Sequence, residues 1–358
     1  MEYKIAVIPG DGVGNEIMTE AIETLKTVGR VYGHHFLIQE VMAGTEAVLQ
    51  GMEPFTEEEL KICRESDAVL MGKLALGHFS DLEQEKRPER ILAILRAELR
   101  LTSDIRPVRF YQSLEEFCPL KKAICGKGMD IVVVRDISGG MFAARGKSGT
   151  LQNVRAAWDT EGYDEQQIHA SARIACEIAG KRRKHVTSLD KAVLLSSSKL
   201  WREILEETAK EYPEITLEHQ LVDHAAFRLV TQPEEYDVIV ASNVFGDIIS
   251  DEIAGLNGIG EMLPAASLNK EMKGLYTPNQ LHRVFEEQAG KNTADPLGMI
   301  LATAMMLEYS FSMEEEARAI RSAVESVIEE RCATADFCSE SRILLSTNEM
   351  GNAVRQKI

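Results

Sequence analysis

The stretch ASNVFGDIISDE, residues 241–252, carries the strongest indication of the fold. It follows a short apolar run, YDVIV at 236–240, which is bounded by polar residues and is typical of a buried strand. Gly246 can serve a turn, and the three isoleucines that follow it have helical spacing. A strand, a turn and a helix are therefore predicted here in succession.

Two aspartates on the predicted helix, Asp247 and Asp251, are four residues apart. That spacing places both carboxylates on one face of the helix, one turn apart. Two like charges there destabilise the helix unless a positive partner lies between them, and Mg²⁺ or Mn²⁺ prefers such oxygen ligands. Taken alone, the pair is also compatible with an ordinary solvated helix face, so both interpretations stay open.

Composition limits the classes of protein to which the chain can belong. With 358 residues it is long enough for two domains, and 44% hydrophobic with 27% charged residues is typical of a globular protein. The net charge of −17 argues against nucleic acid or an anionic membrane as the main partner, although an arginine cluster could still bind a small anion. Six scattered cysteines and the lack of a signal-like or membrane-spanning stretch indicate a cytoplasmic protein.

Strand-like and helix-like segments alternate along the chain, which is typical of the α/β class. The predicted buried strands are 4–8, 67–72, 130–135, 192–195 and 236–240. The predicted helices include 17–28, 90–99, 299–307 and 313–330.

Three further motifs accompany the stretch at 241–252: IPGDGVG at 8–14, LDKAVLL at 189–195 and HQLVDHAA at 219–226. In their order and spacing, the four motifs together resemble the metal-dependent β-decarboxylating dehydrogenases, the isocitrate/isopropylmalate dehydrogenase family. The resemblance extends from about residue 3 to about residue 310, and the pattern is most similar to that of the isopropylmalate enzymes.

The resemblance implies an α/β fold of two domains, with a central mixed sheet flanked by helices. Residues 1–102 and 257–358 would form a large, discontinuous domain on the cofactor side. Residues 103–256 would form a small domain for dimerisation, metal and substrate, with the site in the cleft between the two. The implied assembly is a homodimer with shared active sites.

Arg96, Arg106 and Arg135 match arginines that bind substrate carboxylates in this family. A planar guanidinium makes bidentate, charge-assisted bonds to a carboxylate, although any one of these arginines alone is more typical of a surface ion pair. Leu92 matches a position that lines the pocket for the substrate's apolar group. The implied substrate is a small anionic carboxylate.

Asp223 joins Asp247 and Asp251 as the implied ligands of Mg²⁺ or Mn²⁺, one of the three reaching in from the neighbouring subunit. The metal would bind the hydroxyl and carboxylate of a 2-hydroxy acid and stabilise the enolate as CO2 leaves. Lys191 matches the family's proton-shuttling lysine, also supplied across the dimer, so Lys191 and Asp223 are the predicted catalytic residues. Without the resemblance, Lys191 could be a surface lysine and Asp223 a cap or turn residue.

The chain departs from the family pattern at three places. Phe142 occupies the position of the catalytic tyrosine and has no proton to give. The segment from Lys73 lacks the Gly-Pro pattern found near nicotinamide. The adenosine segment is replaced by TPNQLHRVFEEQAG at 277–290, about two residues longer, so His282 and Asp295 remain as candidate contacts of NAD or NADP.

Three hypotheses of function follow. The first is a metal- and NAD(P)-dependent oxidoreductase that oxidises, with or without decarboxylation, a malate-type 2-hydroxy acid such as 3-isopropylmalate. The second is a ligand-binding or regulatory member of the family without redox turnover. The third is a metal-assisted decarboxylase or lyase that needs no nicotinamide. Phe142 and the segment 277–290 favour the second and third hypotheses, whereas Lys191 and the aspartates favour the first and third.

Overall fold

The structure is a computed structural model, and it describes all residues except 1, 50–52, 75–89 and 144–145. The chain forms two compact units. One unit comprises Met1–Arg100 and Ile259–Ile358, and the other comprises Leu101–Gly258. Both units are built from strands and helices in alternation, so the predicted α/β class is confirmed.

The strands of the first unit lie in the order β2-β1-β3-β12-β11. All neighbouring pairs in this order are parallel except β11 and β12, which are antiparallel. The interior of β1 and the whole of β3 are buried, as their apolar sequences predict. The strands are β1 (Glu2–Gly10), β2 (His35–Glu40), β3 (Ala68–Lys73), β11 (Pro264–Leu268) and β12 (Gly274–Pro278).

One helix of this unit, α10, is buried almost throughout, because its apolar side chains surround the helix axis. It packs against β11, β12 and β3, and also against α1 and α11. The helices are α1 (Gly14–Tyr32), α2 (Thr45–Leu49), α3 (Glu57–Glu65), α4 (Arg90–Glu98), α10 (Leu297–Tyr309), α11 (Glu314–Glu329) and α12 (Thr347–Arg355). Two short strands, β13 (Cys332–Ala333) and β14 (Ile343–Leu344), pair with each other.

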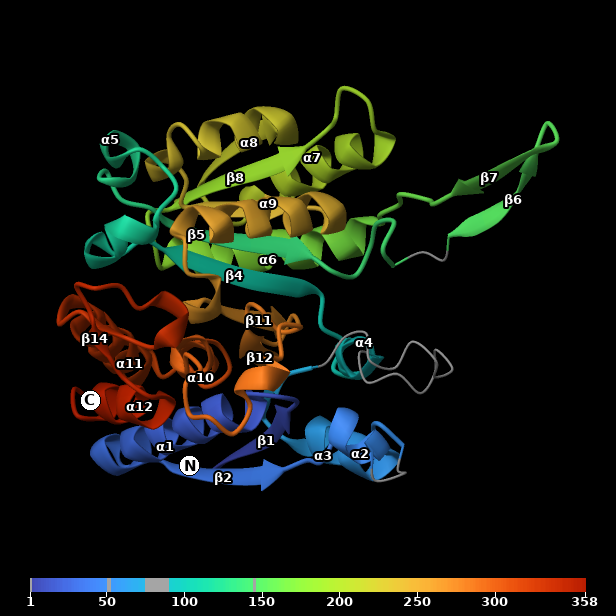
Figure 1. The fold of residues 1–358 in the computed structure, drawn as a ribbon. Coiled ribbons are helices and arrows are strands. Elements are labelled where there is room, and N and C mark those ends of the chain that lie inside the picture. The colour runs from blue at the N-terminus through green and yellow to red at the C-terminus, as the bar shows by residue number, and fades with distance from the viewer. Residues whose placement is uncertain (1, 50–52, 75–89, 144–145) are drawn as a thin grey trace. The chain divides into compact units, whose positions relative to one another are not determined.

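The strands of the second unit lie in the order β4-β5-β10-β8-β9, with only β4 and β5 antiparallel. Helix α6 packs against β5, β10 and α7, whereas α9 packs against β4 and β5 and contacts α8 (Figure 1). The strands are β4 (Ser103–Arg109), β5 (Asp130–Asp136), β8 (His185–Asp190), β9 (Thr216–Leu221) and β10 (Val238–Ala241). The helices are α5 (Lys122–Cys125), α6 (Glu165–Gly180), α7 (Ser196–Ala209), α8 (Val222–Leu229) and α9 (Asn243–Asn257).

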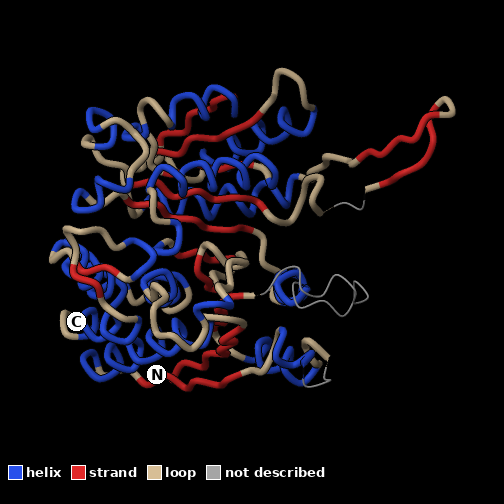
Figure 2. Tube along the Cα trace, in the orientation of Figure 1, coloured by secondary structure: helices blue, strands red, loops and turns tan. Residues whose placement is uncertain are grey.

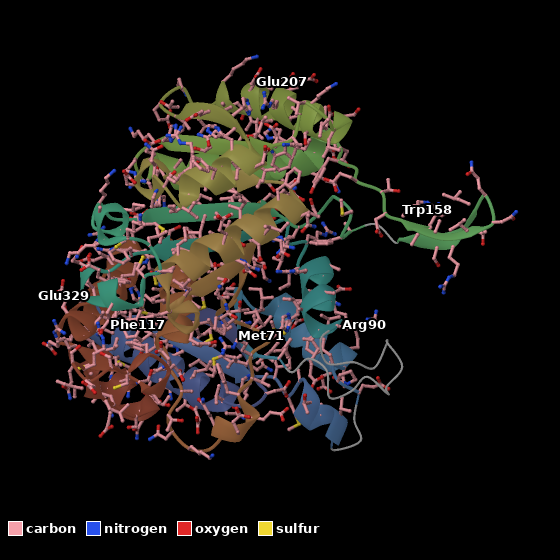
Figure 3. The ribbon with its side chains drawn as sticks, turned by 45° about the horizontal axis from the view of Figure 1, so that its top comes forward. Met71, Arg90, Phe117, Trp158, Glu207 and Glu329 are labelled. Atoms are coloured by element: carbon pink, nitrogen blue, oxygen red, sulfur yellow. The ribbon has the colours of Figure 1, made fainter. Side chains whose placement is uncertain are left out.

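A two-stranded hairpin, β6 (Lys147–Leu151) and β7 (Val154–Trp158), extends away from the rest of the second unit (Figure 2). Trp158 lies on this arm and is 43% exposed (Figure 3). Nearly every residue of both strands of the arm is exposed.

Two sequence predictions were wrong. The strand predicted at 192–195 is a turn, and the true strand is β8, which ends at Asp190. The apolar run misled the prediction because Val193 and Leu194 are exposed, at 65% and 75%, and lie outside the core. Gly246 does not serve a turn either, because α9 already begins at Asn243.

None of the helices described is both long and apolar enough to cross a membrane.

Candidate active site

The end of β10 and the start of α9 place the two helical aspartates. Ser242 has an extended backbone at the N-cap, and α9 begins at the next residue. Asp247 and Asp251 follow one turn apart, with side chains that are 40% and 68% exposed. Both carboxylates are thus accessible to a ligand from solvent.

Arg135 lies beside the start of this helix because β5 and β10 are parallel, with Arg135 in register with Ala241. Its Nε and Nη2 donate to the Oδ1 of Asn243 at 3.1 and 2.8 Å. Its Nη1 donates to Asp247. The arginine is only 7% exposed, so these bonds fix its guanidinium in one orientation.

Gly246 allows this close packing. A Cβ atom at Gly246 would lie 2.7 Å from the Cβ of Arg135, which no real side chain tolerates. The glycine of the 241–252 stretch is therefore explained by the approach of strand and helix and not by a turn.

Arg106, on β4, contacts the second aspartate of the helix. Its Nη1 donates to the Oδ1 of Asp251 at 3.1 Å. Its Nε and Nη2 lie 3.4 and 3.3 Å from the Oδ2 of the buried Asp104. Two arginines that were predicted to bind substrate carboxylates are thus each paired with a carboxylate that was predicted to bind metal.

Lys191 and Asp223 form a third pair of the same kind. Lys191 directly follows β8, and Asp223 lies in the first turn of α8, which directly follows β9. The two strands are parallel, with Asp190 in register with Leu221, so their ends bring the two side chains together. The hydrogen bond from Lys191 is the main cause that lowers the pKa of the Asp223 carboxyl, which is therefore ionised at neutral pH.

Asp223, Asp247 and Asp251 are the side chains that would hold the divalent cation implied by the sequence. They offer oxygen donors only, which suits a hard divalent cation such as Mg²⁺ or Mn²⁺. Each carboxylate forms an ion pair with an arginine or lysine side chain. Among the residues that the structure describes, no three metal-binding side chains lie together. The donor chemistry fits the metal, and the site needs a rearrangement of ion pairs or a further ligand to hold it.

Phe142 follows a turn that is tightly bound. The Oδ1 of Asp136 accepts from the backbone N–H groups of Ser138 and Gly139, both at 2.9 Å. Asn243 donates through Nδ2 to the Gly139 carbonyl at 2.9 Å. Phe142 itself is 58% exposed.

Sequence reasoning missed Asn243 and Tyr163. Asn243 binds Arg135 and the turn at Gly139, and its backbone N–H donates to the hydroxyl of Tyr163 at 2.8 Å. Burial is the main cause that raises the pKa of Tyr163, so this phenol stays protonated. The two residues are 80 positions apart, and only the position of Asn243 inside the 241–252 stretch could have suggested a role.

The remaining predicted site residues belong to the other unit, in which Leu92 and Arg96 lie one turn apart on α4. His282 is exposed. Asp295 is buried at the start of α10, where its Oδ1 accepts from the Leu297 N–H at 2.9 Å. Burial raises the pKa of Asp295 to about 8.

The predicted cofactor segment contains acceptors that suit a nicotinamide dinucleotide. Two buried oxygens of this segment have no hydrogen-bond donor in the described parts of the chain: Asn279 Oδ1 and Gln288 Oε1. A dinucleotide carries ribose hydroxyls, an adenine amino group and a carboxamide, all of which donate. Because buried acceptors are normally satisfied, the residues present fit such a group.

Arginines and a lysine paired with carboxylates, at the strand ends of an α/β unit, suit an α/β protein that binds a small anionic ligand. The chain belongs to the isocitrate/isopropylmalate dehydrogenase family, whose sequence model matches residues 4–354.

Individual relatives agree with this assignment. The chain is 46% identical over 355 residues to a 3-isopropylmalate dehydrogenase of Clostridium acetobutylicum, covering 99% of this chain and 98% of the relative. It is 43% identical to a 3-isopropylmalate dehydrogenase of Thermotoga maritima, covering 99% of each. Among solved structures, an isocitrate dehydrogenase from Methylococcus capsulatus has a TM-score of 0.82 at 29% identity, over 99% of each chain.

Proposed function

We propose that the chain oxidises a malate-type 2-hydroxy acid with NAD or NADP and a divalent cation, and that 3-isopropylmalate is its substrate. The observation that carries this proposal is the set of three cation–carboxylate pairs, Arg135–Asp247, Arg106–Asp251 and Lys191–Asp223. Each pair joins a group suited to substrate with a group suited to metal. The names of the relatives support the choice of substrate.

The pairs couple the binding of substrate and metal. Without ligands, Arg135 and Arg106 neutralise Asp247 and Asp251. A cation that binds the aspartates frees the Nη1 donors of Arg135 and Arg106, which can then bind the substrate carboxylates. Each ligand therefore removes the counter-ion that competes with the other, and the two should bind cooperatively.

The chain's own residues would prepare the reaction. When bound, the divalent cation supplies Lewis-acid chemistry and the dinucleotide accepts the hydride. Arg106 and Arg135 would orient the substrate through its carboxylates. Once the ion pair with Asp223 is broken and the Lys191 ammonium has lost a proton to solvent, its neutral amine would accept the hydroxyl proton at Nζ. Phe142 cannot protonate the product carbon, which makes this last step slow.

A homodimer with shared sites is part of the proposal. Phe227 on α8 and Ile248 on α9 are 65% and 62% exposed, and the two helices pack side by side. Leu151 and Val154, on the hairpin arm, are 60% and 67% exposed. A second copy that covers these side chains would bury apolar surface and could bring its own Lys191 and Asp223 to the partner's site.

The proposed location is the cytoplasm. All six cysteines are free thiols, and four of them are buried. Free thiols are typical of a reducing compartment.

The test is an assay of dinucleotide reduction with 3-isopropylmalate and Mn²⁺. Purified chain should reduce NAD or NADP only when both the acid and the cation are present. Arg135→Lys should lose most of this activity, because a lysine cannot make the bidentate contact. Lys199→Arg on α7 serves as a matched control. If metal and acid bind but no dinucleotide is reduced, the chain has no redox function.

A further inference from the structure

A buried ion pair lies at the end of β3, the strand that Met71 marks in Figure 3. Lys73 is the last residue of this strand, and its side chain is 3% exposed. Its ammonium donates to the carboxylate of Glu261, which is 10% exposed, and to the carbonyl of Gln280 at 3.0 Å. The catalytic proposal above assigns no role to either charged residue.

A second cation encloses the pair from the segment 277–290. Arg283 Nη1 lies 3.5 Å from Glu261 Oε1. The Lys73 ammonium lies 5.2 Å from the centre of the Phe285 ring, and the guanidinium carbon of Arg283 lies 4.8 Å from the same centre. Glu261 and Phe285 are therefore each contacted by both cations, which gives four side chains one shared set of ionic and cation–π contacts.

Backbone bonds attach the same segment to two other elements. The Leu74 N–H donates to the Leu281 carbonyl at 3.0 Å, next to Lys73. The Val13 N–H, at the start of α1, donates to the Val284 carbonyl at 3.0 Å. Gly12 makes room for that carbonyl, because a Cβ there would lie 2.0 Å from it. The segment thus depends on its attachment points at β3 and α1.

Burial makes the Lys73 contacts interdependent. It lowers the pKa of Lys73 and raises the pKa of Glu261, so each charge depends on the other to remain ionised. Removing Lys73 alone leaves the buried Glu261 carboxylate with only Arg283, 3.5 Å away, as its cation, whereas removing both members leaves neither buried charge of the pair. Comparing the single with the double removal therefore distinguishes a less stable fold from a displaced segment 277–290.

We propose that Lys73 is a positioning residue, which holds the segment 277–290 in the conformation that receives the dinucleotide. The proposal rests on the proposed function. Lys73 contacts Gln280 and Phe285. The acceptors Asn279 Oδ1 and Gln288 Oε1 lie just outside these two residues in the sequence, so the Lys73 contacts help to fix the positions of both acceptors.

Two variants and a control test the proposal. Lys73→Met removes the ammonium, and Lys73→Met/Glu261→Leu removes both charges of the pair. Lys270→Met is the control, because Lys270 makes an exposed pair with Glu271 in the same unit. The first readout is trypsin cleavage after Arg283, whose side chain is 61% exposed, in the absence of any ligand. The second is the Kd for NAD and for NADP by calorimetry.

Both variants should be cleaved after Arg283 at least about tenfold faster than the parent chain, because the segment detaches more often. Both should bind the dinucleotide at least about tenfold more weakly, with kcat at saturating dinucleotide changed by less than about threefold. Unchanged cleavage, or a double variant that regains the parent's affinity, would overturn the positioning role. A parent chain that binds no dinucleotide would refute the proposed function and the link to cofactor, while the cleavage rates would still decide whether Lys73 holds the segment.

Discussion

The guanidinium carbon of Arg135 lies 5.9 Å from the centre of the Phe142 ring. A tyrosine at 142 would keep its ring near this cation, which favours release of the phenolic proton. We expect Phe142→Tyr to raise kcat by about a hundredfold or more, because a positioned general acid contributes about a hundredfold to ten-thousandfold. Steady-state kinetics should show the gain in kcat and not in substrate affinity, since the proton is needed after binding.

Phe142→Leu is the control for this variant and should give no gain. If Phe142→Tyr binds metal, substrate and dinucleotide but turns over no faster, then water or another side chain supplies the proton, or protonation is not the slow step.

Asp247→Asn should weaken Mn²⁺ binding at least about tenfold, because the change removes a charged oxygen ligand. Calorimetry without substrate measures the effect. Glu207→Gln, an exposed change on α7, should leave the affinity as it was (Figure 3). Equal Mn²⁺ affinity in Asp247→Asn and the parent chain would mean that the metal binds elsewhere.

Metal and substrate should bind cooperatively, because Arg135 and Asp247 neutralise each other in the free chain. The Kd of the substrate, measured without dinucleotide, should fall by about fivefold or more when Mn²⁺ is added. In Asp247→Asn this gain should shrink, since the competing counter-ion is already gone. If the Kd of the substrate for the parent chain is the same with and without Mn²⁺, the two ligands are not coupled.

The buried carboxyl of Asp295 predicts how stability changes with pH. Burial raises its pKa from 3.8 to about 8 in the folded chain. Between these values the folded chain holds a proton that the unfolded chain has released, so the free energy of unfolding falls as pH rises. The slope from this one group is at most about 1.4 kcal/mol per pH unit.

Urea unfolding at several pH values within that window measures the slope. Asp295→Asn should flatten it, because the amide does not titrate while its oxygen can still accept from the Leu297 N–H. An unchanged slope in the variant would show that other groups cause the pH dependence.

The homodimer predicts the effect of charge on its apolar surface. Ile248→Asp should shift the chain from dimer to monomer in sedimentation experiments, because the new carboxylate would be buried without a partner. Val31→Asp, at a site 56% exposed on α1, should leave the dimer intact. If the parent chain sediments as a monomer and binds its ligands with full affinity, the shared site is refuted.

Sequence periodicity alone predicted the alternation of strands and helices and the placement of Asp247 and Asp251 one turn apart on one helix. The error at 192–195 shows the limit of that method, because Val193 and Leu194 are apolar yet exposed. Periodicity reports where apolar residues are, and it cannot say whether they face the core of one chain or the surface of another.

The contacts that hold the site could not be predicted, because they join residues that are distant in sequence. Arg135 and Asn243 are 108 positions apart, and Lys73 and Glu261 are 188 apart. No local pattern marks a lysine as buried, since lysine is normally exposed and becomes buried only with a partner. The strand order that brings these residues together is a property of the whole unit.

The missing side chain at Gly246 has a consequence for how the site can vary. The Arg135 side chain occupies the space that a Cβ at 246 would need, so β5 and α9 can approach this closely only because residue 246 has no side chain. An alanine there would push the helix outward and carry Asp247 away from Arg135, which would enlarge the site for every ligand at once. The distance between Arg135 and Asp247 therefore cannot change independently of the backbone of β5 and α9.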